Sequence, residues 1–255
     1  MRRGDSAGAE AAARELAAQR AAVLLAIGST LARIARQAAP ELPIVFVTPG
    51  DPVTAGLVAS LARPGRSMTA VMFEYPELSG KRLELLTEVL PQARRVLVLY
   101  DPRDVSPRQS VAAAREAAAK LRIALVEREV RTDEDVVRAM TELDEVDGLL
   151  AVPGGVTSSH YAAMIRAANV KRRATVFPAG SDSTRDALLA YGASDSDAAR
   201  EAARLVDKVL HGANAGDLPV ERPTKITLIV NLRTGKTLGL TIPASVLARA
   251  DEVTR

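Results

Sequence analysis

The sequence predicts an α/β protein of the doubly wound class, in which helices cover both faces of a largely parallel sheet. Short apolar runs that end at Gly, Pro or Asp alternate along the chain with longer segments of helical spacing. With 255 residues, of which 47% are hydrophobic, the chain is long enough to bury a sizeable core in one large or two modest domains.

Six apolar runs have the length and composition of buried strands. Their side chains are apolar without strict alternation, which is the pattern that strands covered on both faces require. The predicted strands are 22–28, 43–48, 95–101, 147–154, 174–178 and 187–192.

The segments between these runs have helical spacing and helix boundary signals. Thr132 stands three residues before Asp135 as a capping pair, and Gly212 follows His211 at the expected end of a helix. Strands and helices that alternate in this way form right-handed βαβ units, whose ligands bind beyond the carboxyl ends of the strands. The predicted helices are 76–93, 106–121, 132–146 and 196–212, with another expected to begin near Pro52.

The first predicted strand ends at Gly28, Ser29 and Thr30, at a turn from strand to helix. Two hydroxyls and the free N–H groups of a starting helix form a seat for a carboxylate or a phosphate. Ordinary N-capping explains the same residues equally well, so both interpretations stay open.

Three further strand ends are polar. The second strand ends at Thr48 and continues into PGDPV, where Asp51 is expected either to cap the following helix or to pair with a ligand amine. Asp101 ends the third strand, and Pro153 and Gly154 end the fourth, where glycine permits a close backbone approach. Together these strand ends predict a small-molecule site.

Composition argues against several other partners. The formal net charge is only +3, no block of five like charges occurs, and the aromatic residues are three Phe and four Tyr, so nucleic acid is not an expected partner. No apolar run reaches the roughly 18–20 residues that a membrane span needs. Because the chain has no cysteine, it cannot form disulfides or thiolate metal sites.

Catalytic signatures are also absent. The chain contains no GxSxG, GxxxxGK[ST], GxGxxG or HExxH motif. Its two histidines, His160 and His211, are expected to serve helix ends rather than a metal. The sequence therefore predicts no enzyme activity, no cofactor and no metal site.

Several segments resemble a known family. The strongest are IVFVTPGDPVTAGLVASLARPG, KRLELL, DLPVERPTK and NLRTGKTLGLTIPASVLARADEV. Along nearly the whole chain they resemble bacterial ABC transporter substrate-binding proteins of the tryptophan/tyrosine transport type. The resemblance implies a type I periplasmic binding protein fold, with two Rossmann-like lobes that close on an amino-acid-like or aromatic ligand.

The resemblance also implies a domain map and a set of ligand residues. Lobe one would comprise 1–73 and 193–222, and lobe two 74–192 and 223–255, with hinges at the crossovers. The implied ligand residues are Gly28, Ser29, Thr30, Thr48 and Asp51 on one lip of the cleft, and Tyr75, Asp101, Pro153, Gly154, Phe177 and Tyr191 on the facing lip and at the crossovers.

The sequence departs from the family pattern in two places. Family members carry a secretion signal and a strand–helix–strand unit before the point where this sequence begins, so the first lobe is expected to be incomplete, with exposed sheet edges. Gly180, Ser181 and Asp182 stand where the family more usually has an aromatic and a charged residue, which leaves the identity of the ligand open.

The expected function is that of the solute-binding component of an ABC importer. Its partners would be a small molecule and the permease subunits, its location the periplasm by resemblance, without a signal peptide in the chain as written, and its state monomeric. The alternatives are a cytoplasmic sensor domain of the same fold, an α/β enzyme with Asp51 or Asp101 as general base, and a truncated product without a transport role.

Overall fold

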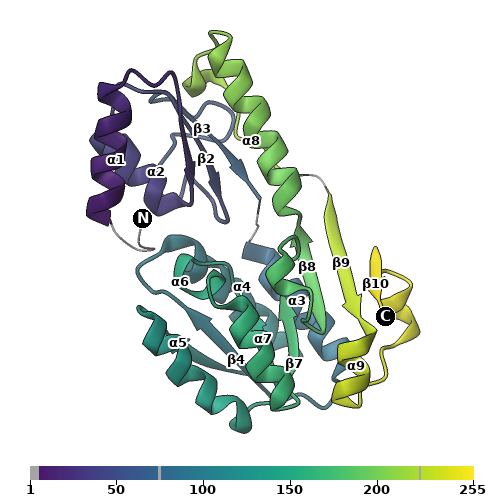
Figure 1. Cartoon of the computed structure of the whole chain (residues 1–255). Helices are drawn as coiled ribbons and strands as arrows, with labels where there is room; N and C mark the ends of the chain where they lie inside the picture. The colour runs from purple at the N-terminus through teal and green to yellow at the C-terminus, as the bar shows by residue number, and fades with distance from the viewer. Residues whose placement is uncertain (1–5, 74–75, 224) are drawn as a thin grey trace. The chain divides into compact units, whose positions relative to one another are not determined.

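The computed structural model describes residues 6–73, 76–223 and 225–255 (Figure 1). By its internal contacts the chain divides into two units, which are described separately. Unit 1 comprises Met1–Glu74 and Asp195–Thr224, and unit 2 comprises Tyr75–Ser194 and Lys225–Arg255. The chain therefore passes between the units three times, at 74/75, 194/195 and 224/225.

Unit 1 is built on a parallel sheet of three strands in the order β1-β2-β3. Helix α2 packs on β1 and β2, and α8 packs on the neighbouring strands β2 and β3. Helix α1 packs against α2. The elements are α1 (Ser6–Ala18), β1 (Leu24–Ile27), α2 (Ser29–Ala38), β2 (Ile44–Thr48), β3 (Met68–Met72), α8 (Asp195–Leu210) and the 3-10 turn η3 (Ala215–Asp217).

The two edges of this sheet differ. The outer edge of β3 is covered by the segment that ends at Glu221, whose N–H donates to the Ala70 carbonyl at 2.9 Å. In the described part of the chain β1 pairs with β2 alone, and its Leu25 and Ile27 are 54% and 61% exposed. The strand register places these two side chains on the face where α8 covers β2 and β3. On that face β1 is therefore an uncovered apolar edge strand.

Unit 2 contains a seven-stranded sheet in the order β10-β9-β8-β7-β6-β4-β5. Among the described strands of this unit, only β8 and β9 pair in antiparallel fashion, because β8 runs toward the passage at 194/195 and β9 starts from the passage at 224/225. The strands are β4 (Arg95–Tyr100), β5 (Ala124–Glu129), β6 (Gly148–Ala151), β7 (Ala174–Phe177), β8 (Leu189–Ala193), β9 (Ile226–Asn231) and β10 (Glu252–Thr254).

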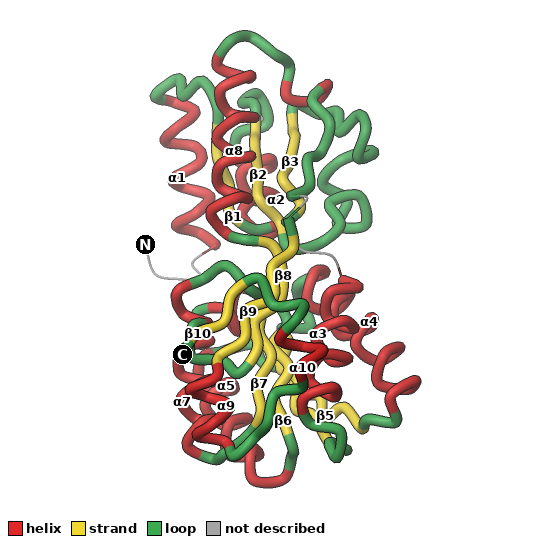
Figure 2. The backbone as a smooth tube through the Cα atoms, turned by 90° about the vertical axis from the view of Figure 1, so that its right-hand side faces the viewer, coloured by secondary structure: helices red, strands yellow, loops and turns green. Residues whose placement is uncertain are grey.

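Helices cover both faces of this sheet, as Figure 2 shows. Leu86 of α3 and Val98 of β4 belong to the core on one face, and Leu149 of β6 and Ile165 of α7 to the core on the other. The helices are α3 (Pro76–Val89), α4 (Val105–Leu121), α5 (Asp133–Ala139), α6 (Gly155–Ser158), α7 (Tyr161–Val170), α9 (Leu232–Leu238) and α10 (Ala244–Leu247), with 3-10 turns η1 (Met140–Glu145) and η2 (Asp182–Thr184).

The predicted α/β class with mostly parallel sheets is confirmed, and each of the six predicted strands overlaps a strand of the structure. The capping pair is also confirmed, since Thr132 Oγ1 accepts from the Asp135 N–H at 3.2 Å and Asp135 Oδ2 accepts from the Thr132 N–H at 3.1 Å. Strands β3, β5, β9 and β10 were not predicted from the sequence. Strand β5 has the sequence ALVERE, whose charged residues do not fit the apolar pattern of a buried strand. They are tolerated because β5 is the edge strand of the sheet and one side of it is open to solvent.

The helix expected to begin near Pro52 is wrong. The chain makes one helical turn there and stops at Gly56, which has φ +69°. The Gly56 N–H donates to the Val53 carbonyl and the Leu57 N–H to the Pro52 carbonyl, which is the pattern of a Schellman motif. A glycine in the left-handed region ends the helix one turn after it begins.

Core packing in unit 2 gives a first prediction. Leu149→Ala removes a side chain that is fully buried in the centre of the sheet, so a loss of about 2–5 kcal/mol in the free energy of unfolding is expected. The measurement is urea denaturation followed by circular dichroism. The control is Val137→Ala, which truncates an exposed side chain of α5 and should change stability by less than about 0.5 kcal/mol. Equal losses in the two variants would contradict this packing.

Candidate functional site

The predicted residues of unit 1 gather at the carboxyl ends of β1 and β2. These strands are parallel and in register, and the Gly28 N–H donates to the Val47 carbonyl at 2.7 Å. Gly28 has φ +104°, a conformation that favours glycine, and turns the chain directly into α2. No heavy atom lies within 4 Å of a Cβ built at Gly28, so the backbone here is open to a ligand.

The start of α2 can accept an anion. Gly28 at the N-cap position makes no side-chain capping hydrogen bond, Ser29 is buried, and Thr30 is exposed in the first turn. The positive end of a helix dipole favours a carboxylate or a phosphate at such a position. Of the two interpretations of Gly28, Ser29 and Thr30, side-chain capping is not the one seen: Gly28 occupies the capping position and makes no side-chain hydrogen bond.

The loop after β2 is held by its own side chains. Asp51 accepts from the Val53 N–H at 2.9 Å through Oδ1 and from the Thr54 hydroxyl at 2.7 Å through Oδ2. Thr48 is buried, and its Oγ1 accepts from the Gly50 N–H at 3.3 Å. Both carboxylate oxygens of Asp51 thus stabilise the turn. Part of the hydrogen-bonding capacity of Asp51 is therefore already used within its own loop.

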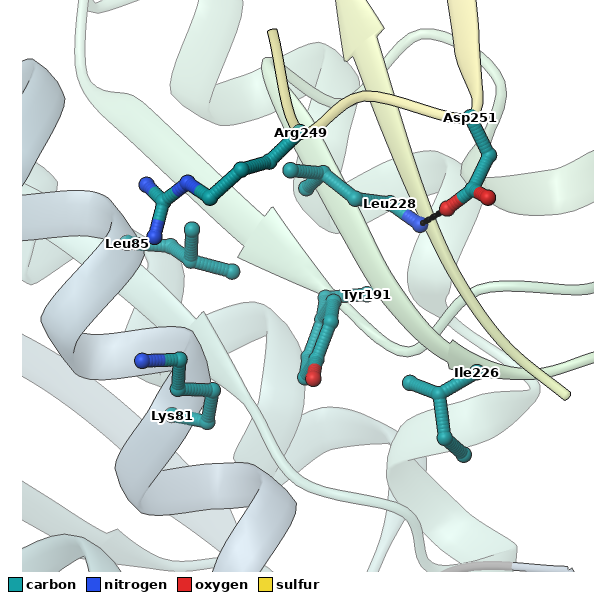
Figure 3. Close-up of a pocket in the computed structure, with 7 residues that line it drawn as sticks. All are labelled: Lys81, Leu85, Tyr191, Ile226, Leu228, Arg249 and Asp251. Carbon is teal, nitrogen blue, oxygen red and sulfur yellow. Dashed lines mark hydrogen bonds between the residues drawn. The ribbon is translucent and has the colours of Figure 1, made fainter. Parts of the chain in front are cut away.

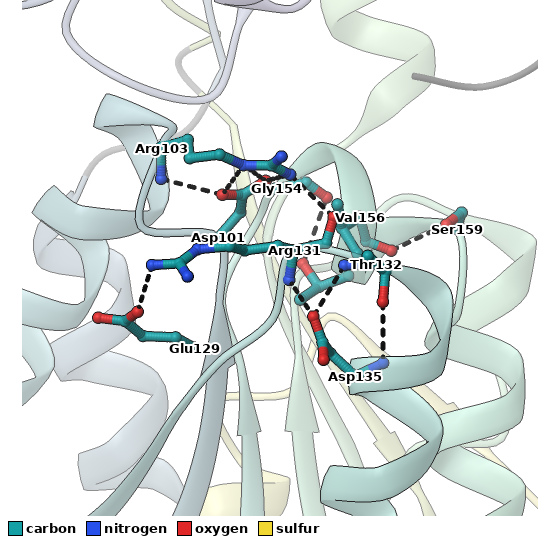
Figure 4. A network of polar contacts seen from close by, with 10 residues as sticks. Asp101, Arg103, Glu129, Arg131, Thr132, Asp135, Gly154, Val156 and Ser159 are labelled. Carbon is teal, nitrogen blue, oxygen red and sulfur yellow. Dashed lines mark hydrogen bonds and ion pairs between the residues drawn. The ribbon is translucent and has the colours of Figure 1, made fainter. Parts of the chain in front are cut away.

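In unit 2 the predicted Asp101 lies at the carboxyl end of β4, in the polar network of Figure 4. Its carboxylate accepts from the backbone N–H of Arg103 at 2.9 Å and from both Nε and Nη2 of the same side chain, the latter at 2.7 Å. Arg103 Nη2 also donates to the Arg131 carbonyl at 2.9 Å, which ties the end of β4 to the loop after β5. Fork-shaped pairing of this kind fixes the arginine in one orientation.

Two opposing effects act on the pKa of Asp101. Burial by itself raises the pKa of this carboxyl, which is only 8% exposed. The hydrogen bonds from the side chain and the backbone of Arg103, with the positive charges of Arg103 and Arg131, together outweigh burial and lower the pKa below its usual value. The Asp101 carboxyl group is therefore ionised at neutral pH.

The turn after β6 lies beside the start of α4. The Gly154 N–H donates to Ser158 Oγ at 3.3 Å, and a Cβ at Gly154 would come within 2.8 Å of Pro107 Cγ. Pro153 and Gly154 are both buried. The glycine thus permits a close approach of two segments of unit 2.

Phe177 is fully buried in the core of unit 2. Its ring meets Tyr161 edge to face with 5.1 Å between ring centroids, and the Tyr161 hydroxyl donates to the Val152 carbonyl at 3.1 Å. The Phe177 side chain therefore packs in the core of unit 2 against Tyr161, at the carboxyl end of β7.

Tyr191 lies apart from Asp101 and Gly154, in the pocket of about 200 Å³ shown in Figure 3. Leu85 of α3 and Leu228 of β9 are apolar neighbours in this pocket. Lys81 and Arg249 on its rim are engaged by Glu84 and Glu88, respectively. The complete lining is Lys81, Leu85, Tyr191, Ile226, Leu228, Arg249 and Asp251.

Three further residues were singled out in the sequence: Tyr75, His160 and His211. Tyr75 lies outside the described residues. His211 Nδ1 hydrogen-bonds to the Asp207 carbonyl at the end of α8, whereas His160 precedes α7 and its Nδ1 lies 3.0 Å from the Val156 carbonyl. Across the described ranges, no three acidic or histidine side chains gather as a metal site would require, and no helix has the length and apolarity to cross a membrane.

Sequence reasoning missed Arg103 and Arg131, which dominate the polar edge of unit 2. For Arg103 the signal was the DPRD motif after a predicted strand, but an arginine two residues from an aspartate does not reveal whether the two will pair. Arg131 follows β5, a strand that the sequence did not predict.

Comparisons with known proteins agree on fold and family. The family described as ABC transporter substrate binding protein matches residues 2–254. A structure of a conserved domain protein from Vibrio cholerae O1 biovar eltor str. N16961 is 29% identical, with a TM-score of 0.90 over 98% of this chain and 84% of that one. An ABC domain in complex with L-Trp from Streptococcus pneumonia is 21% identical, with a TM-score of 0.89 over the same shares.

A curated relative, the tyrosine-binding protein of Clostridioides difficile (strain R20291), is 27% identical over 219 residues, which are 86% of this chain. The chain spans 63% of the length of that relative. The fold is that of the type I periplasmic binding proteins, as the resemblance implied. The chain belongs to the ABC transporter substrate-binding protein family.

The Asp101 network gives a pH-dependent prediction. Asp101→Asn removes a charge-assisted interaction from a buried site, so a loss of about 1.5–3 kcal/mol in the free energy of unfolding is expected near neutral pH. Because folding lowers the pKa of Asp101, its contribution is present above the unfolded pKa of about 3.9 and is lost as the pH falls through the folded value.

The measurement is urea denaturation of the wild type and the variant from pH 7 to pH 3. The stability difference should shrink steadily below about pH 4. Asp182→Asn, which affects an exposed ion pair with Arg185, is the control and should show little difference at any pH. A difference that is the same at pH 7 and pH 3 would contradict the assignment.

Proposed function

We propose that the chain is the solute-binding component of an ABC importer and binds an amino-acid-like, aromatic ligand. The observation that carries the proposal is the match of this binding-protein family along residues 2–254, in a chain whose two units both end their parallel strands in polar groups. Ligands of doubly wound sheets bind at such strand ends.

The start of α2 supports the amino-acid class. A free amino acid carries an α-carboxylate, and the positive end of the α2 dipole with the exposed Thr30 hydroxyl would stabilise it. The open backbone at Gly28 lets the ligand approach without steric conflict. We propose that Gly28, Ser29, Thr30, Thr48 and Asp51 of unit 1 contribute to ligand binding, together with Tyr75, Asp101, Pro153, Gly154, Phe177 and Tyr191 of unit 2.

Tyrosine is the first ligand to test, because the relative named as a tyrosine-binding protein aligns with 86% of this chain. Binding would work by closure of two lobes that correspond to the two units, with hinges at the three passages of the chain. The ligand stabilises the closed state, and permease subunits would recognise that state outside the cytoplasm, in the periplasm.

A binding role without catalysis fits the acids of the site. Asp101 is ionised and paired with Arg103, and Asp51 accepts two hydrogen bonds from its own loop. A general base needs a free carboxylate with a pKa near the operating pH. Both carboxylates are instead engaged by groups of their own loops.

Ligand binding is tested by a thermal-shift screen of the chain with L-tyrosine, L-tryptophan, L-phenylalanine and branched amino acids. A ligand at about 100 times its Kd adds about 2.7 kcal/mol to the free energy of unfolding if it binds only the folded state. A shift with aromatic amino acids is expected. A cooperative transition that no amino acid moves would argue against the proposal.

The anion seat is tested by Thr30→Val, which removes the hydroxyl with little change in shape. If Thr30 donates to the carboxylate, the Kd for tyrosine should rise about 3–10-fold, the equivalent of one hydrogen bond. Isothermal titration calorimetry measures the change. Thr237→Val, which removes an exposed hydroxyl of α9 in unit 2, should leave the Kd unchanged. An unchanged Kd in Thr30→Val would remove this residue from the site.

A further inference from the structure

Arg82 is a buried charge that the proposed site does not use. It lies in α3 and is 0% exposed, the only lysine or arginine that is buried among the residues the structure describes. Burial of a guanidinium is costly unless the group is hydrogen-bonded. Its Nε–H donates to the backbone carbonyl of Tyr191 in β8 at 2.7 Å, which links α3 to this strand.

The strand register explains why that carbonyl needs a donor. The Asn231 N–H donates to the Leu188 carbonyl, so in the antiparallel ladder with β9 the hydrogen-bonded residues of β8 are the even-numbered ones. The backbone groups of Tyr191 therefore face the other way, toward β7. The pairing of β7 with β8 ends at Phe177 and Ala190, one residue too early to serve the Tyr191 carbonyl. Arg82 donates the hydrogen bond that a longer β7 would have donated to the Tyr191 carbonyl.

The opposite edge of the same pair is closed in a similar way. Leu228 stands across from Tyr191 in β9, and its N–H donates to Asp251 Oδ2 at 2.8 Å while its carbonyl accepts from the Asp251 N–H at 2.8 Å. The two strands are thus held at this level by a side chain on each side, as Figure 3 shows for Asp251.

These contacts lie where the chain leaves unit 2. Helix α3 begins just after the passage at 74/75, β8 ends just before 194/195, and β9 begins just after 224/225. Arg82 joins α3 to β8, and the ladder joins β8 to β9. Inside unit 2, the elements next to the three passages (α3, β8 and β9) are therefore joined to one another by hydrogen bonds.

We propose that Arg82 is a positioning residue for ligand binding: by holding the Tyr191 carbonyl it fixes the end of β8 against α3, so that conformational change between the units is confined to the few residues at the passages. Hinges work when a few residues absorb the change in φ and ψ while the flanking elements stay rigid. The inference rests on the proposed function for its effect on ligand affinity, but the rigidity of β8 is testable without a ligand.

The test is amide hydrogen exchange of the full chain without ligand, in the wild type and in Arg82→Met. Methionine preserves apolar volume but cannot donate a hydrogen bond. Exchange in a peptide that spans 189–193 should become about 10-fold faster or more, the effect of losing one charge-assisted hydrogen bond at this strand. Peptides from β4 and β5 should exchange at the wild-type rate.

A matched control exists in the same unit. Arg173 also donates its Nε–H to a backbone carbonyl, that of Leu143 at 2.8 Å, but far along the chain from the three passages. Arg173→Met should speed exchange near 140–146 and leave 189–193 unchanged. Arg82→Lys, which keeps the charge and a donor, should restore part of the protection that Arg82→Met loses.

Ligand affinity gives the second readout. If the wild type binds tyrosine, Arg82→Met should raise its Kd about 3-fold or more while Arg173→Met leaves it unchanged. If the wild type binds no amino acid, the proposed function fails, and the exchange experiment still decides the role of Arg82. Unchanged exchange at 189–193, or equal acceleration throughout unit 2, would overturn the proposal. Failure of both Arg82 variants to unfold cooperatively would also overturn it, because Arg82 would then serve only the stability of the unit.

Discussion

Parallel strand pairing is the constraint on which the rest of this structure depends. Parallel neighbours cannot be joined by a short hairpin, so each pair requires a crossover, and most crossovers here are helices that cover the faces of the two sheets. Covered faces require continuously apolar strands such as IVFVT and VLVLY. The same geometry brings the carboxyl ends of all parallel strands to one edge, where polar loops can gather without breaking the core.

The single antiparallel pair follows from the chain path. Strand β9 enters unit 2 after the chain has passed through unit 1, so it is not bound to its neighbour by a crossover helix and pairs with β8 in the opposite direction. Because β7 ends before β8 does, the last residues of β8 have a partner strand on the β9 side but none on the β7 side. The Arg82 side chain supplies a hydrogen bond to the Tyr191 carbonyl of β8, and the Asp251 side chain does so for the Leu228 N–H of β9.

The polar edges of the two units have different chemistry. The edge of unit 1 combines an open backbone at Gly28 with the start of α2 and the exposed Thr30 hydroxyl. The edge of unit 2 is a network of paired charges in which Asp101 is already satisfied by Arg103. The positive end of a helix dipole suits the carboxylate of a small ligand, whereas a saturated ion pair chiefly holds loops in place.

The sequence by itself determined the α/β class, the six most apolar strands, the Thr132 cap and the family, because each depends on local composition or on motifs read along the chain. Only the tertiary structure decided the partners of the site residues: that Asp101 pairs with Arg103, that Phe177 packs on Tyr161, and that Arg82 reaches the Tyr191 carbonyl. Strands such as β5 and β9, with half-buried residues, also emerged only there. The physical reason is that burial and hydrogen bonding join residues such as Arg82 and Tyr191, 109 positions apart, and no local pattern encodes which distant group a side chain will meet.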